Sequence, residues 1–113
     1  MTSTRLHRGN ISSAVFANDY QYFITSSGSF SRNHDNSIVI SKCSLAQDLF
    51  IKSIHSFSNA HGKFKGVMNI KSSNNIGDNL LISCGNQDDG RIIIWDIENR
   101  ESVDEVVNFN TNE

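Results

Sequence analysis

The sequence predicts an all-β protein made of two similar units, each with four antiparallel strands. Short runs of β-branched and aromatic residues alternate with Gly, Asn, Asp and Ser along the whole 113-residue chain, as in a many-stranded β protein. Proline is absent while Ser and Asn are abundant, which favours short strands joined by polar turns. The strand pattern also occurs twice, and this repeat divides the chain into two units.

Eight strands are predicted, four in each unit, and polar turns separate them. The expected strand ranges are 11–16, 20–25, 37–41, 49–54, 66–71, 79–83, 91–97 and 102–109. The clearest turns fall at 18–19, 33–36, 74–78 and 88–90. Because side chains alternate between the faces of a strand, Ile92 and Ile94 share one face, and we expect them to pack between neighbouring units.

An offset of 54 residues aligns the two halves of the chain. At this offset His7 falls on His61, Phe16 falls on Ile70, and the run 38–40 falls on the run 92–94. The segment 23–28 matches 80–85 at an offset of 57 instead, which places Ser26 on Ser83. The longer turn at 74–78 explains the three extra residues.

The second unit carries the most informative motif. Residues 89–96 run Asp-Gly-Arg-Ile-Ile-Ile-Trp-Asp, so a turn aspartate is followed by apolar residues and a Trp-Asp pair. The preceding strand ends in Ser83-Cys84-Gly85, and a histidine, His61, stands upstream in the order His-Gly rather than Gly-His. Together these features resemble a WD repeat of the β-propeller family, and the resemblance covers residues 6 to 109.

The resemblance implies a buried structural chain of hydrogen bonds rather than a catalytic site. By resemblance, the chain would join His61, Ser83, Asp89 and Trp95, with Trp95 as a buried filler that ends its strand. The first unit is degenerate. It keeps a turn aspartate, whereas Ser41 and Lys42 stand in place of the Trp-Asp pair, and His7 and Ser26 are the candidates for the remaining positions.

The implied architecture is an incomplete propeller of about two antiparallel four-stranded blades. We expect a degenerate repeat over 6–57, a second repeat over 58–109, and flexible ends at 1–5 and 110–113. Two blades cannot close a ring, since each blade buries its faces against neighbours. A two-blade piece leaves two outer faces bare, and depending on blade direction these carry residues such as Val39 and Ile93, or Ile38, Ile40, Ile92 and Ile94. The chain would therefore be a fragment, a truncated reading frame, or a subunit that completes its ring by self-association or with another chain.

Composition argues against several other classes. The net charge is −2 with no basic run, which disfavours nucleic-acid binding. The longest apolar run, 92–95, is far shorter than the roughly 20 residues that span a bilayer, so no membrane segment is expected. The two cysteines fit free buried thiols in a cytoplasmic or nuclear protein, with a disulfide as the alternative.

No catalytic, cofactor or metal site is predicted, and we expect the chain not to be an enzyme. The four histidines match no zinc spacing. The neighbouring carboxylates Asp88 and Asp89 fit a turn better than acid–base catalysis.

The sequence therefore favours a protein–protein interaction scaffold in an intracellular multiprotein assembly. The candidate partner-binding residues are Phe30, Arg32 and His34, in a loop longer than a hairpin needs, together with Asp88. A disordered polar insertion explains that loop equally well. The alternatives for the whole chain are an RNA- or chromatin-associated propeller subunit, a small enzyme, and a truncated fragment without independent function.

Overall fold

The computed structural model describes residues 5–28, 36–44, 50–62, 65–85 and 90–107, which include eight β-strands. The strands are β1 (Ser13–Ala17), β2 (Tyr22–Ser26), β3 (Ile38–Ser44), β4 (Phe50–Phe57), β5 (Val67–Ser72), β6 (Leu80–Gly85), β7 (Arg91–Asp96) and β8 (Glu101–Val107). The all-β prediction is confirmed, and each predicted strand corresponds to one of these. Within the described ranges, no helix has the length and apolar character needed to cross a membrane.

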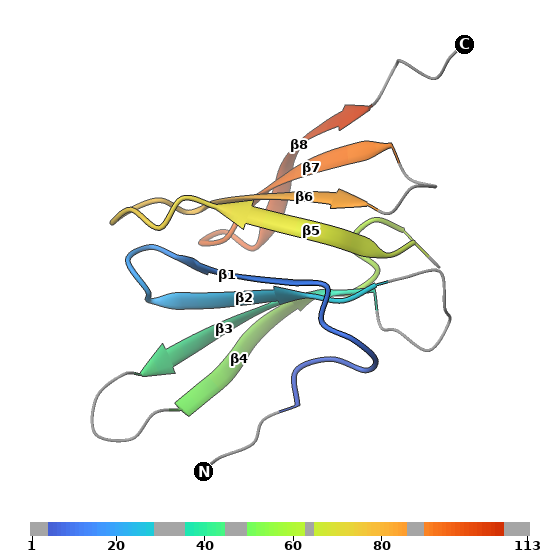
Figure 1. Cartoon of the computed structure of the whole chain (residues 1–113). Coiled ribbons are helices and arrows are strands. Elements are labelled where there is room, and N and C mark those ends of the chain that lie inside the picture. The colour runs from blue at the N-terminus through green and yellow to red at the C-terminus, as the bar shows by residue number, and fades with distance from the viewer. Residues whose placement is uncertain (1–4, 29–35, 45–49, 63–64, 86–89, 108–113) are drawn as a thin grey trace.

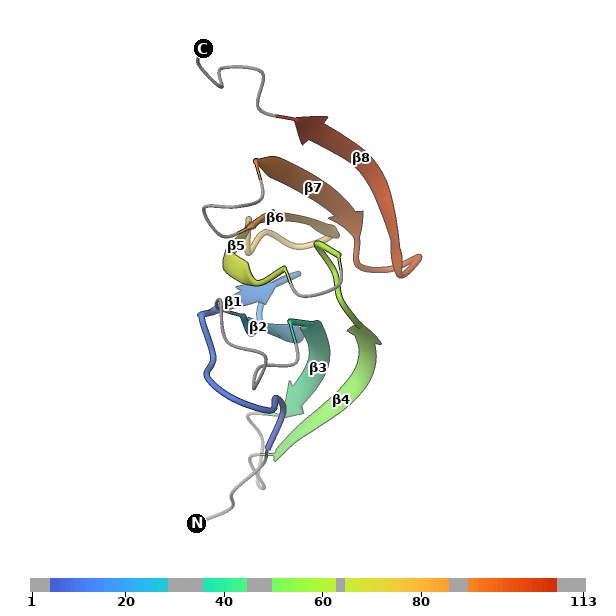
Figure 2. The same cartoon turned by 90° about the vertical axis from the view of Figure 1, so that its right-hand side faces the viewer.

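The strands form two antiparallel sheets in sequence order, β1-β2-β3-β4 and β5-β6-β7-β8, called here the first and the second sheet. Figure 1 shows that one sheet lies against the other, and Figure 2 shows the side view, in which β1 and β5 lie next to each other while β4 and β8 are outermost. Each unit is thus a meander of four strands that pairs only with itself.

The two sheets repeat in their strand order and in one irregularity of the pairing between their last two strands. In the first sheet a β-bulge interrupts the β3–β4 pairing between Ile40 and Ser41. In the second sheet a bulge interrupts the β7–β8 pairing between Ile94 and Trp95, which are the residues 54 positions further on. A bulge changes the direction of the side chains beside it. Because it occurs at the same place in both units, the internal repeat is present in the structure as well as in the sequence.

The predicted alignment is wrong in the strands that precede β3 and β7. Thr25 pairs with Val39, and Ser83 pairs with Ile93, so Thr25 rather than Ser26 is the counterpart of Ser83. A shift of one residue moves a side chain to the opposite face of a sheet. For the same reason the counterpart of Ile70, which pairs with Ser83, is Ala14 and not Phe16.

The hydrophobic core lies between the two facing sheets. The first sheet contributes a face on which Ile24, Ile38 and Ile40 are fully buried. The second sheet contributes its opposite face, whose buried side chains are Ile70, Leu81, Ile93 and Trp95. The packing is therefore head-to-tail, since the two faces in contact are not equivalent in the repeat.

Ile92 and Ile94 do share one face, but this face does not pack between the two units, so the blade direction is the one that leaves it bare. Ile92 is 40% exposed and Ile94 is half-buried, while the intervening Ile93 and Trp95 make the contact with the first sheet. Alternation along the strand groups the side chains correctly, but it does not indicate which face receives a neighbour.

Polar contacts fasten the two sheets at their inner strands and turns. The Ser12 hydroxyl donates to the Val67 carbonyl at 2.6 Å, and the Ser13 hydroxyl donates to Asn69 at 2.8 Å. The β1–β2 turn and the β5–β6 turn exchange two hydrogen bonds, because the amide of Tyr20 donates to Asn74 and the amide of Gly77 donates to Asn18. These contacts orient one sheet relative to the other beyond what apolar packing alone would do.

A further polar contact lies nearer the outer part of the interface. The Tyr22 hydroxyl of β2 donates to the Glu98 carboxylate at 3.2 Å across the two sheets. Partial burial, together with the nearby Glu98 charge, raises the pKa of Tyr22, so this phenol stays a donor over a wide pH range.

The backbones of the two units approach each other closely at Gly28. A Cβ at this position would overlap the backbone of Gly66 and Val67. We predict that Gly28→Ala lowers stability by about 1–3 kcal/mol, because the two sheets must shift apart to accommodate the methyl group. Thermal unfolding measures this loss. The control is Gly77→Asn, a site with φ of 81° and open space, where asparagine tolerates the backbone. Equal melting temperatures for Gly28→Ala and the wild type would contradict the close packing.

Candidate functional site

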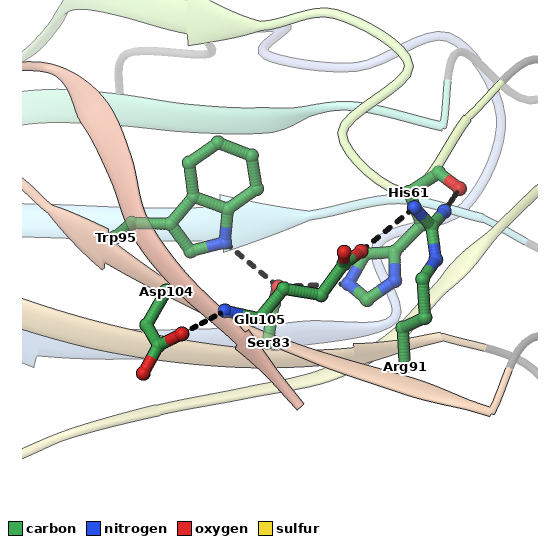
Figure 3. Close-up of polar contacts among 6 residues, drawn as sticks. All are labelled: His61, Ser83, Arg91, Trp95, Asp104 and Glu105. Atoms are coloured by element: carbon green, nitrogen blue, oxygen red, sulfur yellow. Dashed lines mark hydrogen bonds and ion pairs between the residues drawn. The ribbon is translucent and has the colours of Figure 1, made fainter. Parts of the chain in front are cut away.

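A chain of hydrogen bonds connects three of the four residues expected from the repeat motif (Figure 3). The indole nitrogen of Trp95 donates to the Ser83 hydroxyl oxygen at 2.8 Å. The same oxygen lies 2.8 Å from Nε2 of His61. His61 and Ser83 are fully buried, and Trp95 is 7% exposed, as expected for a filler at the end of its strand. The chain ties β6 and β7 to the segment that precedes β5.

Arg91 fastens the same segment from the edge of the sheet. Its guanidinium donates to the carbonyl oxygen of His61 and forms an ion pair of 2.9 Å with Glu105 on β8. The Arg91 and Glu105 side chains are 33% and 45% exposed, so the ion pair adds little stability by itself. Its effect is to link β7, β8 and the backbone at His61 in one network.

Trp95 also contacts the first sheet. Its ring packs on Phe57 of β4 with a centroid separation of 4.4 Å. Asp96, the next residue, caps the β7–β8 turn by accepting hydrogen bonds from the amide and the side chain of Asn99, at 3.0 and 2.8 Å. The hydrogen bond from the backbone amide of Asn99 is the main cause that lowers the pKa of Asp96. This carboxylate therefore stays ionised as the pH falls.

The first unit holds a shortened version of the same chain. Nε2 of His7 lies 2.7 Å from the Thr25 hydroxyl, and Nδ1 of His7 lies 3.2 Å from the Ser37 hydroxyl. Ser26, the residue predicted for this position, instead bonds the Ser12 hydroxyl at 2.8 Å on the other face. Ser41 replaces the tryptophan, and its buried hydroxyl has no hydrogen-bond partner among the described residues.

The His61–Ser83 pair has the separation of a nucleophile and its general base, but not the surroundings. A nucleophilic serine needs a substrate beside its oxygen, whereas the Ser83 oxygen is fully buried and accepts the indole N–H. The pair therefore acts as a packing element. In the part of the chain that the structure describes, no group of three His, Cys, Asp or Glu side chains could hold a metal ion.

Several predicted residues lie outside the described residues. They are Asp89, the fourth member of the hydrogen-bond chain, and the four candidate partner-binding residues Phe30, Arg32, His34 and Asp88. Of the two cysteines, Cys84 is a free thiol as predicted, but it is half-buried rather than buried.

An apolar surface, called here the open face, lies on the side of the second sheet that points away from the first, and it includes Ile92 and Ile94, as expected for one of the two blade directions. Its exposed fractions are 52% for Leu80, 47% for Ile82, 40% for Ile92 and 49% for Val106, with Ile94 half-buried among them. The strand register places these five side chains on one face. The alternation Leu80, Ile82 and Ile92, Ile94 carried this signal in the sequence.

The chain matches no protein-family model, and a search of curated proteins finds no match. Structure and sequence of the chain itself therefore carry the functional argument.

Two buried serines offer a matched test of the hydrogen-bond chain. We predict that Ser83→Ala lowers stability by about 1–3 kcal/mol, because Trp95 and His61 both lose a buried partner. Ser41→Ala removes a buried hydroxyl without a partner, so the same substitution there leaves stability unchanged or higher. Chemical denaturation followed by Trp95 fluorescence measures both. Equal losses in the two variants would contradict the structural role of the chain.

Proposed function

We propose that this chain forms two neighbouring blades of a WD-type β-propeller and serves as a protein–protein interaction scaffold in an intracellular assembly. The observation that carries the proposal is the head-to-tail packing of two equivalent sheets, which leaves an apolar open face on the second sheet. Packing of this type adds further sheets in the same direction, since every sheet offers one face of each kind.

The open face has the chemistry of a protein contact. Its centre is aliphatic, and an exposed apolar patch on a soluble domain commonly marks an interaction site. Carboxylates lie on the same face beside the apolar centre, from Asp96, Glu101 and Asp104. An acidic border repels phosphates, so this surface favours a protein partner over RNA or chromatin.

The proposal predicts that a charge on the open face abolishes binding to other proteins. Tagged wild-type protein and the variant Ile82→Asp would be captured from cells, and the proteins bound to each identified by mass spectrometry. We expect a defined set of proteins with the wild type and its loss with the variant, because an unpaired buried carboxylate is costly at an interface.

The control is Ile76→Asp, which places the same charge in the β5–β6 turn, where Ile76 is 82% exposed. Circular dichroism and Trp95 emission establish that both variants are folded. An identical set of proteins with wild type and Ile82→Asp would contradict the role of the open face. Salt-sensitive recovery of RNA in place of proteins would favour the nucleic-acid alternative.

A further inference from the structure

We propose that the open face of the second sheet binds the outer face of the first sheet in a second copy of this chain, so that copies join head-to-tail into a closed ring. This outer face is the side of the first sheet that points away from the second sheet. The inference rests on the proposed propeller architecture and names the partner of its open face.

The open face is the repeat counterpart of a face that is already covered in the first sheet. Its residues Leu80, Ile82, Ile92, Ile94 and Val106 occupy the sheet positions held in the first sheet by Tyr22, Ile24, Ile38, Ile40 and Phe57. In the first sheet the second sheet covers this surface, so that Ile24, Ile38 and Ile40 are 0% exposed. The open face has the same aliphatic centre without such a cover.

The outer face of the first sheet is the repeat counterpart of the second-sheet surface that covers Ile24, Ile38 and Ile40. By register, Phe23, Thr25, Val39 and Ser41 correspond to Leu81, Ser83, Ile93 and Trp95 of the second sheet. The same chain thus carries both halves of its own sheet-to-sheet interface. On the first sheet Thr25, Val39 and Ser41 are already buried, so the accessible part of this half lies at Phe23 and the aromatic residues beside it. Repetition of that contact between copies is a heterologous interface, which closes when the rotation per copy divides a full turn.

The outer face has apolar side chains available for this contact. Phe16, Tyr20 and Phe23 form an aromatic cluster with ring centroids 5.0 and 5.3 Å apart, in which Tyr20 is 51% and Phe16 is 37% exposed. Phe23 corresponds to Leu81, which belongs to the core cluster that includes Ile24 and against which Tyr22 packs. Between copies, the aromatic cluster would therefore meet Leu80 and Ile82.

Charge also favours a second copy. On the open face Asp96, Glu101 and Asp104 stand where the first sheet has Lys42, Lys52 and His55, so the border has changed from basic to acidic. The outer face includes a hollow of about 360 Å³ that is lined in part by Arg5, Leu6 and Val39. Arg5 brings a cation to the side that the acidic border would approach.

The number of copies in a ring follows from the number of blades that each chain supplies. Each chain supplies two sheets, and propellers typically hold about 4–8 blades, so a ring contains roughly two to four copies.

Sedimentation of the purified full chain at micromolar concentration tests the proposal with two complementary variants. Ile82→Asp damages the open face, and Phe16→Asp damages the outer face. We expect the wild type to sediment as a closed species of about two to four chains, and each variant alone as a monomer. An equimolar mixture of the two variants forms a 1:1 dimer, because each variant keeps the face that the other has lost.

Leu80→Asp and Tyr20→Asp are second variants of the two faces, for use where either first variant fails to fold. Leu80 is 52% exposed, and Tyr20 has φ of 66°, a conformation that aspartate tolerates. Ile76→Asp is the control and keeps the wild-type mass. A variant that still self-associates, or a mixture that stays monomeric, would overturn the head-to-tail contact.

The sedimentation test and the capture experiment can contradict the two proposals independently of each other. A monomeric wild type that still captures proteins through Ile82 would overturn the second-copy inference and leave the scaffold standing. A closed ring that captures no other protein would support the second copy and overturn the scaffold.

Discussion

The packing of one sheet against the next is the interaction on which the rest of this structure depends. A four-stranded sheet cannot bury both of its faces by itself, and a hydrophobic face stabilises the fold only when another element removes it from water. Here Ile24, Ile38 and Ile40 of one sheet form a single buried cluster with Ile93 and Trp95 of the other. The turn-to-turn hydrogen bonds and the close approach at Gly28 all lie along this same contact, so they depend on it.

The two units differ in the contacts made at one equivalent position, which is Trp95 in the second unit and Ser41 in the first. Trp95 reaches both Ser83 within its own sheet and Phe57 in the neighbouring sheet, so a single side chain joins the hydrogen-bond chain to the core. Ser41, at the same position of the first unit, reaches neither and leaves its hydroxyl unpaired. The first sheet has Phe16 and Phe23 on the corresponding face instead, which replaces one large buried ring by two partly exposed ones.

Sequence reasoning predicted the eight strands, the internal repeat and the burial of Trp95, because turn residues and side-chain alternation are local properties. It misplaced Thr25 and Ser26, since a match of Ser26 to Ser83 by identity ignored the register that decides the face. It also left open whether the bare faces carry Val39 and Ile93 or Ile92 and Ile94. Which of two apolar faces is covered depends on the order in which the units stack, and no local pattern encodes that order.

The same stacking order explains why the open face is as apolar as a core surface. Selection for solubility alone would place polar residues at Leu80, Ile82 and Ile92, as at the outward positions of most two-layer sheets. Ile82, Ile92 and Ile94 instead match the buried triad of the first sheet, Ile24, Ile38 and Ile40, position for position, while the flanking charges have changed sign. A surface that keeps a core-like centre and alters only its border suits a repeated contact with a different neighbour. The polar changes at the border then determine which neighbour that is, because unlike charges favour one partner and like charges exclude others.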